Sequence, residues 1–385
     1  MRNAQWFVAD YLPRWLTRAM INQKFVVEAL NIDGQPDALA PTTLTQARVV
    51  FALAHLHLVT RDQRFLDVAR DIHAFMDGAL RDPDGGYWQS TECFEKRSYD
   101  QSFALMALVT LRRADRSAVP AARISNLWHF IVESLTESAT GALWENMEMA
   151  RHGAANGDLR AQNPHMHMFE AALQAFEMTG EVIWMDRAQH LFTLLQRYFV
   201  DPDTGAICEF VAADLTRLTT QDGSRREPGH QYEWAWLLHR FADLGGDATA
   251  RTVADRMISF VEAHGLRGDG PLRDAPFDAL DRAGDVTEAT HLLWPLTEAG
   301  KYYAATGALA RAHAIENLIF KRYFTGGPNF AWSNQLDGNG RVLWPTALSR
   351  LIYHVALFVT EGARAGLWPL NDIDQTQTFS KEITI

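Results

Sequence analysis

Two histidines, each followed three residues later by a glutamate, could perform acid–base chemistry. They are His167 with Glu170, in "NPHMHMFEA", and His230 with Glu233, in "EPGHQYEWAWLL". Residues three apart share one face of a helix, and the proline shortly before each pair suits a first helical turn. Histidine gives and takes protons near neutral pH, and a carboxylate one turn away can fix its tautomer or raise its basicity. The spacing therefore predicts two helices that each present a proton-transfer group.

Other polar residues stand alone within strongly apolar helical segments. Arg48 lies in "TTLTQARVVFALAHL" and His354 in "PTALSRLIYHVALF". A lone arginine there could stabilise an oxyanion, although a single buried histidine or arginine is often only a core residue. We interpret His165 as a residue behind or at the rim of a site. The remaining candidates for contact with a substrate are Tyr99, Asn163, His291, Trp294 and Glu298.

The elements that carry these residues recur along the chain. Glycine-containing turns appear at intervals of roughly 50 to 65 residues, the period of a repeat architecture. The turn glycines are Gly34, Gly85, Gly141, Gly205, Gly268 and Gly326.

Each turn is followed by a helical segment that is apolar on most faces. These six segments are predicted to begin near Thr43, Tyr99, Asn163, Pro228, Thr287 and Pro345. Amphipathic helices lie between them, and the clearest are Phe65–Met76, Ser125–Leu135, Val182–Tyr198 and Ala248–Glu262. A helix that is apolar all round is buried, whereas one with a single apolar stripe covers it from outside. The pattern predicts an all-α fold, an (α/α)6 barrel of six inner and six outer helices in one domain spanning residues 1–385. An open α-solenoid is the alternative.

Composition excludes several classes of protein. The net charge of −11 and the lack of a basic stripe argue against nucleic-acid binding. The sequence contains no run of about 18 apolar residues that could span a membrane. The N-terminus lacks the apolar region of a signal peptide, so we expect a cytoplasmic protein. Cys93 and Cys208 fit neither a disulfide framework nor a zinc site.

We expect no metal and no cofactor. His165 and His167 are two residues apart, so a helix points them to different sides, and chelation on a helix needs a spacing of three or four. The sequence contains no HExxH, no dinucleotide GxGxxG, no phosphate-binding GxxxxGK[ST] and no GxSxG nucleophile motif.

The sequence resembles the N-acylglucosamine 2-epimerase superfamily, which includes cellobiose 2-epimerases, mannose isomerases and sulfoquinovose isomerases. The resemblance spans almost the whole chain, and its most specific parts are "NPHMHMFEA", "EPGHQYEWAWLL" and "LLWPLTEA". It implies an (α/α)6 barrel, with His230 and His354 as the acid–base pair. It further implies that the sugar site is lined by Arg48, His167, His230, Glu233, Glu298 and His354.

Two departures from the family pattern affect the expected substrate. Cellobiose 2-epimerases usually carry a Trp-Trp pair before the glutamate of the fifth helix, and "LLWPLTE" here looks more like the mannose isomerases. His291 stands where arginine is common in similar proteins.

We therefore expect an aldose–ketose isomerase that interconverts mannose and fructose through a cis-enediolate. The alternatives are a sugar 2-epimerase, a glycoside hydrolase or lyase, which would need paired acidic catalysts, and a non-enzymatic carbohydrate-binding protein. A phosphorylated substrate stays open, with Arg225 and Arg226 as a candidate phosphate site. The expected partner is a small sugar, and the protein is expected to be a monomer or homodimer.

Overall fold

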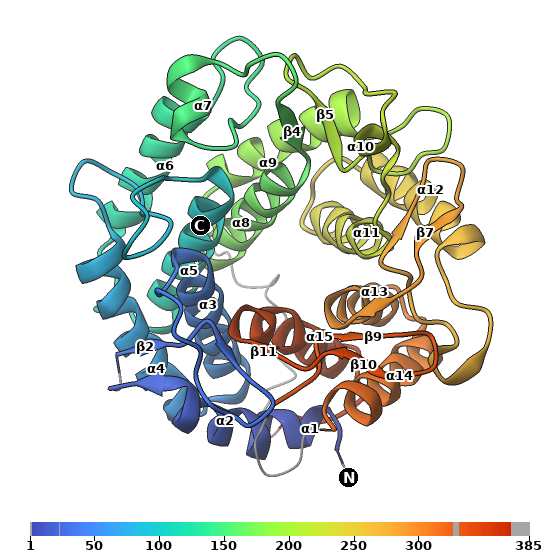
Figure 1. The fold of residues 1–385 in the computed structure, drawn as a ribbon. Helices are drawn as coiled ribbons and strands as arrows, with labels where there is room; N and C mark the ends of the chain where they lie inside the picture. The colour runs from blue at the N-terminus through green and yellow to red at the C-terminus, as the bar shows by residue number, and fades with distance from the viewer. Residues whose placement is uncertain (1, 23, 326–330, 371–385) are drawn as a thin grey trace.

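The computed structural model describes residues 2–22, 24–325 and 331–370, which form a closed ring of helices in two layers (Figure 1). The inner layer of the described chain consists of α3 (Thr43–Thr60), α5 (Ser98–Ala114), α8 (Asn163–Thr179), α11 (Pro228–Asp243), α13 (Leu293–Ala305) and α15 (Ile352–Arg364). The outer layer consists of α1 with α2 (Ala4–Trp6 and Leu12–Ala19), α4 (Gln63–Phe75), α6 (Ala121–Leu135), α9 (Ile183–Leu194), α12 (Thr249–His264) and α14 (Leu309–Leu318). Inner and outer helices alternate along the chain.

The ring is closed, which distinguishes a barrel from an open solenoid. Each inner helix contacts the next one, and α15 packs against α3, so that the last inner helix meets the first. The sixth outer position is filled by the N-terminal helices α1 and α2, where the ring of Trp15 lies 5.2 Å from that of Trp332. The predicted (α/α)6 barrel is confirmed.

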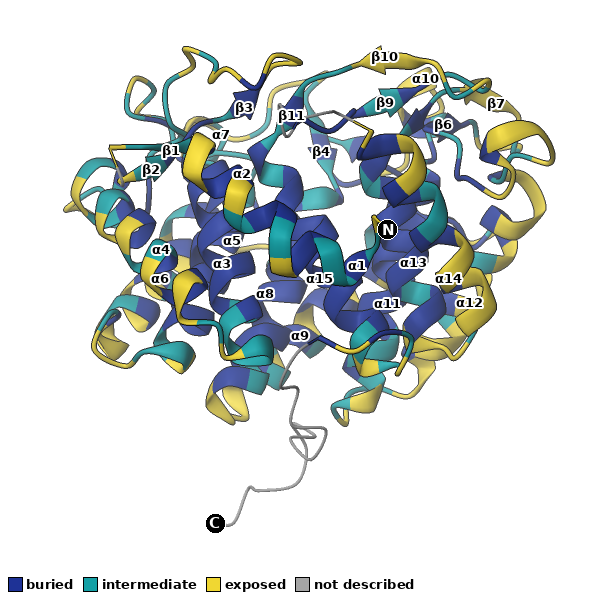
Figure 2. Ribbon diagram, turned by 90° about the horizontal axis from the view of Figure 1, so that it is seen from below, coloured by how far each residue is buried: buried dark blue, intermediate teal, exposed yellow. Residues whose placement is uncertain are grey.

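The two layers differ in burial as their sequences predict. The inner helices are buried on nearly every face, while the outer helices expose one face to solvent (Figure 2). Buried apolar side chains from both layers form one continuous cluster between them. Three outer helices and the N-terminal pair contain a π-helical turn, at Phe7–Tyr11, Met76–Leu80, Leu195–Phe199 and Ile319–Tyr323.

Short hairpins and connections gather at one end of the ring (Figure 2). The strands are β1 (Met20–Ile21), β2 (Phe25–Val26), β3 (Ala29–Leu30), β4 (Leu159–Ala161), β5 (Phe210–Ala212), β6 (Ala279–Leu280), β7 (Val286–Glu288), β8 (His291–Leu292), β9 (Gln335–Leu336), β10 (Val342–Trp344) and β11 (Ala347–Leu348). They pair antiparallel as β1–β2, β3–β11, β4–β5, β6–β7 and β8–β9–β10. The connections also contain the short helices α7 (Met147–His152) and α10 (Gln221–Ser224) and the 3₁₀ turns Gly270–Leu272 and Ser349–Leu351.

Two inner helices begin later than the sequence predicts. Thr287 lies in β7, and α13 starts only at Leu293, because the Asp278 carboxylate accepts the backbone N–H of Leu292 at 2.6 Å and fixes the chain entering the helix. Pro345 follows β10, and α15 starts at Ile352. In both places a short strand directly precedes the helix, β8 before α13 and β11 before the 3₁₀ turn that leads into α15, and the sequence pattern did not separate these strands from the helices.

A repeated hydrogen-bond pattern joins the inner helices to the hairpins. The backbone of Tyr87 donates to and accepts from the side-chain amide of Gln101, both at 2.8 Å. Gln46 holds Val26 in the same way, and Gln231 holds Ile207. Each amide satisfies buried backbone groups of a hairpin that follows an outer helix, as burial requires.

The turn glycines are partly as predicted. Gly141 and Gly205 have φ of +76° and +79°, which glycine adopts without strain. A Cβ on Gly141 would lie 2.5 Å from the His190 ring, so the turn is also tightly packed. In the fifth unit the left-handed residue is Gly270 rather than Gly268, and Gly326 lies outside the described residues. In the described part of the chain, no helix has the length and apolarity needed to cross a bilayer.

Candidate active site

A cavity of about 350 Å³ opens at the hairpin end of the ring, between the N-terminal parts of the inner helices. Most of the residues singled out from the sequence line it, although they come from all six inner units. Those at the cavity wall are Arg48, Tyr99, Asn163, His167, His230, Glu233, Trp294 and His354. The wall also includes Glu209, Glu227, Asn334, Trp344 and Arg350, which the sequence did not single out as site residues.

His354 lies between a carboxylate and a guanidinium. Its Nδ1 is 2.6 Å from Glu298 Oε1, and its Nε2 is 3.4 Å from an Arg48 nitrogen. Burial lowers the pKa of His354 well below its usual value, and the positive charges of Arg48 and Lys301 lower it further. A neutral imidazole fits these contacts, with Nδ1–H donating to Glu298 and the Nε2 lone pair free to accept. Arg48 also donates to the Tyr99 hydroxyl at 2.6 Å.

Glu298 lies behind His354 instead of lining the cavity, so it is placed to orient that ring and not to contact a substrate directly. Its other oxygen is 2.5 Å from Lys301 Nζ, and both side chains are fully buried. The Lys301 ammonium also lies 4.0 Å from the centroid of the Trp236 ring. Burial and the nearby Glu233 raise the pKa of Glu298, and Lys301 opposes that rise. Lys301 therefore favours the ionised carboxylate that His354 needs as its acceptor.

His230 is in the opposite environment. Its Nδ1 lies 2.8 Å from Glu209 Oε2 and 3.3 Å from Glu227 Oε2. Burial opposes the charged form, but these two carboxylates outweigh it and raise the pKa of His230 to about 10. Glu209 is itself fixed, because it accepts hydrogen bonds from the Gln162 side chain and the Glu227 backbone, both at 3.1 Å. His230 is therefore an imidazolium at neutral pH.

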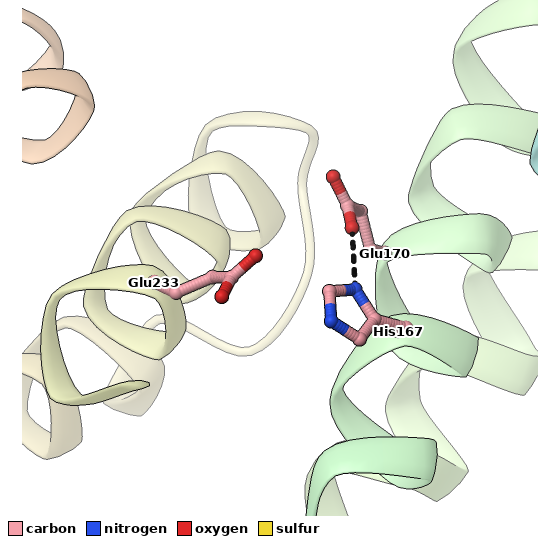
Figure 3. Close-up of side chains that lie close together, drawn as sticks. All are labelled: His167, Glu170 and Glu233. Atoms are coloured by element: carbon pink, nitrogen blue, oxygen red, sulfur yellow. Dashed lines mark hydrogen bonds and ion pairs between the residues drawn. The ribbon is translucent and has the colours of Figure 1, made fainter. Parts of the chain in front are cut away.

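The two His-x-x-Glu pairs behave differently. His167 Nδ1 is 3.0 Å from Glu170 Oε2 within α8 (Figure 3). Glu233 makes no such bond to His230. It projects from α11 toward His167 and Glu170 (Figure 3), and its Oε1 is 3.5 Å from the Tyr353 hydroxyl, which donates to Glu170 at 2.5 Å. The predicted within-helix pair is correct for His167, whereas His230 takes its partner from a hairpin.

His165 and His291 belong to the repeated hairpin contact. His165 Nε2 accepts the Leu143 N–H at 2.9 Å, in the place that glutamine occupies in three other units. His291 Nδ1 lies 2.8 Å from the Pro276 carbonyl, and its side chain is fully buried. The structure therefore places His291 outside the cavity, which corrects its assignment as a substrate-binding residue.

Among the residues that the structure describes, three groups of side chains have donor atoms that could hold a cation. Each group combines one histidine and two carboxylates with ligand atoms within 4.8 Å of one another: His167 with Glu170 and Glu233, His230 with Glu209 and Glu227, and His354 with Glu233 and Glu298. Such N,O ligand sets suit several divalent metals. In every group the histidine Nδ1 already lies within hydrogen-bond distance of a carboxylate, so a shared proton satisfies the same atoms.

Besides the wall residues named above, sequence reasoning missed Lys301 and Tyr353, which contact site residues from behind the wall. Lys301 is three residues after Glu298, a spacing that would have suggested the pair. Tyr353 precedes His354 and had no distinguishing signal. Glu209 lies 21 residues before His230, and only the folded chain shows that the two side chains meet.

Comparison with known proteins identifies the family of the chain. The family model for N-acylglucosamine 2-epimerase matches residues 25–357. A mannose-6-phosphate isomerase of Rhizobium meliloti is 26% identical over 93% of this chain and 95% of its own length. A D-mannose isomerase of Thermobifida fusca is 26% identical over 75% of both chains.

Solved structures show the same fold at lower identity. A D-mannose isomerase superposes with a TM-score of 0.80 at 16% identity, covering 93% of this chain and 97% of the other. A cellobiose 2-epimerase from Bacillus thermoamylovorans gives 0.79 at 17% identity, covering 92% and 98%. Since the family model spans most of the sequence and the barrel is shared throughout, the chain belongs to the N-acylglucosamine 2-epimerase family.

Proposed function

We propose that this enzyme of the isomerase class interconverts an aldose and its ketose, D-mannose and D-fructose or close relatives, by proton transfer. The observation that carries the proposal is that one cavity is faced by His354, which lies beside the Arg48 guanidinium, and by His230, which contacts two carboxylates. The first setting lowers the pKa of His354 and favours a neutral ring, and the second raises the pKa of His230 and favours a protonated ring. An aldose–ketose conversion needs such a pair, because one group must remove a proton while another supplies one. The names of the relatives, mannose-6-phosphate isomerase and D-mannose isomerase, support the same reaction class.

In the proposed first step, His354 Nε2 removes the proton from C2 of the open-chain aldose. Electrons from the C2–H bond form the C1–C2 double bond of a cis-enediolate, and negative charge develops on the carbonyl oxygen. Arg48, adjacent to His354, stabilises that charge. His230 donates its proton to the developing oxygen, and His167 assists opening of the pyranose ring.

In the second step, His230, now neutral, removes the O2 proton, and the electrons of the O2–H bond form the C2 carbonyl. Protonated His354 returns a proton to C1, which gives the ketose and restores both histidines. Return to C2 from the opposite face would give the 2-epimer, so epimerisation is the alternative outcome at the same site. The Trp294 ring lies 4.8 Å from the His230 ring and 5.9 Å from the His354 ring. A sugar above Trp294 would therefore be within reach of both histidines, and its orientation there determines the product.

The proposal includes catalysis without a metal. Carboxylates already accept protons from the Nδ1 atoms of His167 and His354, and two carboxylates hold the His230 proton. A cation in any of these groups would compete with the proton that the reaction uses.

The test is incubation with free aldoses and ketoses in D₂O, with products separated by chromatography and analysed by NMR. We expect fructose from mannose with deuterium at C1. Glucose deuterated at C2 would indicate the epimerase. Cleavage of a glycoside without any isomerisation, or binding without turnover, would contradict the proposal in favour of a hydrolase or a carbohydrate-binding protein.

A further inference from the structure

Most basic side chains near the cavity are already paired. Arg97 makes two bonds of 2.9 Å to Asp100, and Lys301 is paired with Glu298. Arg48 donates to Tyr99. Arg97 and Lys301 therefore have carboxylate partners. The hydrogen-bond contacts of Arg48 within the described residues are to the neutral groups Tyr99 and His354, and it is the guanidinium assigned to the oxyanion.

Arg225 and Arg226, the phosphate candidates from the sequence, are also paired. Arg225 binds Glu227 at 2.8 Å and Glu288 at 2.6 Å. Arg226 is buried against Asp201 at 2.9 Å. Neither guanidinium is free to receive a ligand, so that hypothesis loses its support.

Arg350 differs from all of these. Its half-buried side chain lines the cavity, and within the described ranges it makes no hydrogen bond or ion pair. Burial and the charge of nearby Arg48 lower its pKa. Glu28 is the carboxylate that attracts it, but Glu28 is occupied by Thr42 and Thr45, whose hydroxyls donate to it at 2.9 and 2.5 Å.

The backbone at Arg350 is fixed in place. It lies in the 3₁₀ turn Ser349–Leu351, where the Ser349 N–H donates to the Glu28 carbonyl at 2.9 Å. His354 follows four residues later, about one helical turn away, and also lines the cavity. A sugar whose C1 and C2 lie at His354 therefore has a positive charge available one turn farther along the cavity wall.

We propose that Arg350 binds an anionic group at the end of the sugar remote from the carbonyl, and that the preferred substrates are sugar phosphates. This inference rests on the proposed isomerase function and specifies its substrate class. A guanidinium presents a planar fork that matches phosphate oxygens in two parallel hydrogen bonds. A sulfonate shares this tetrahedral oxyanion chemistry, whereas a neutral sugar would leave the charge of Arg350 unpaired.

The experiment compares kcat/KM for mannose 6-phosphate and for mannose in the wild type and in Arg350→Gln. Loss of a charge-assisted hydrogen bond should lower kcat/KM for the phosphate by roughly 10- to 100-fold, mainly through KM. The loss for free mannose should be at least tenfold smaller. Arg341→Gln, an exposed arginine outside the cavity wall, is the matched control and should leave the preference for phosphate intact.

Three outcomes distinguish the possibilities. Equal losses on both substrates, or a wild type that prefers free mannose, would overturn the role of Arg350. If a 6-deoxy-6-sulfonate sugar is converted faster than the phosphate, Arg350 would still be an anion-binding residue. The proposal that sugar phosphates are the preferred substrates would then be overturned. If the wild type converts neither sugar, the proposed function fails. Binding of inorganic phosphate by calorimetry, present in the wild type and lost in Arg350→Gln, would then still test the site.

Discussion

His230 and His354 both line the cavity and are buried to nearly the same extent, but they differ in charge. His230 touches two carboxylates and carries a proton, whereas His354 touches one carboxylate and lies beside Arg48. Burial by itself lowers the pKa of a histidine. The charge of each histidine therefore depends on how many nearby carboxylates are not offset by a cation. That charge determines whether the histidine is proposed as the acid or as the base.

The largest expected effect comes from removing either histidine. His354→Asn and His230→Asn should each lower kcat by at least about 10²- to 10⁴-fold, the usual contribution of general acid–base catalysis. The double variant should lose far less than the product of the two, because the residues act as a unit. Steady-state kinetics measures this, and circular dichroism confirms folding.

His165→Gln is the matched control. Glutamine occupies that place at Gln46, Gln101 and Gln231, so the variant should fold and retain most activity. A full loss of activity in His165→Gln, or retained activity in His354→Asn, would contradict the division into structural and catalytic histidines.

Lys301→Met should disturb the environment of His354, because Lys301 is the ion-pair partner of Glu298, which contacts His354. The buried Glu298 would lose its cation, and breaking a buried pair typically costs about 3–5 kcal/mol. We expect a lower melting temperature and a kcat reduced by roughly the contribution of one general base. The double change Glu298→Gln with Lys301→Met should recover stability but not kcat. Recovery of both would mean that the pair is only structural.

Glu209→Gln should change the pH dependence of activity and stability that arises from His230. Glu209 is the strongest carboxylate that raises the pKa of His230, so its removal should move the alkaline limb of kcat/KM to lower pH. Because the folded pKa of about 10 exceeds the ordinary 6.5, His230 stabilises the wild type below pH 6.5, and this contribution is lost as pH rises toward 10. Denaturant titrations should show a shallower loss in Glu209→Gln. An unchanged pH profile would remove Glu209 from this role.

The smallest expected effect is that of a chelator. If protons occupy the three histidine–carboxylate groups, dialysis against EDTA should change kcat by less than about twofold. If EDTA abolished activity and a single divalent ion restored it, one of these groups would bind a metal. The comparison of two histidine protonation states would then no longer apply. Atomic emission on the purified protein supplies an independent measurement.

Much of the fold could be predicted because helix periodicity is local. Apolar segments that recur with glycine turns indicate buried helices without knowledge of their neighbours. The starts of α13 and α15 were predicted too early because the short strands β8 and β11 precede these helices closely, and pairing with distant strands, which local pattern does not show, defines them.

Local sequence pattern was enough to predict the six-unit helical repeat and the bond between His167 and Glu170. It also predicted that Arg48, His230 and His354 belong to the site. The bond between His167 and Glu170 forms within one helix, where a spacing of three residues suffices.

The partners of the other polar groups depend on how distant segments of the chain pack together. Glu209 is 21 residues from His230 and reaches it through a hairpin. His291 turns toward a backbone carbonyl, and Arg350 faces the cavity with no hydrogen bond or ion pair to any residue that the structure describes. Charge state depends on groups within a few ångströms, and packing of distant segments brings those groups together.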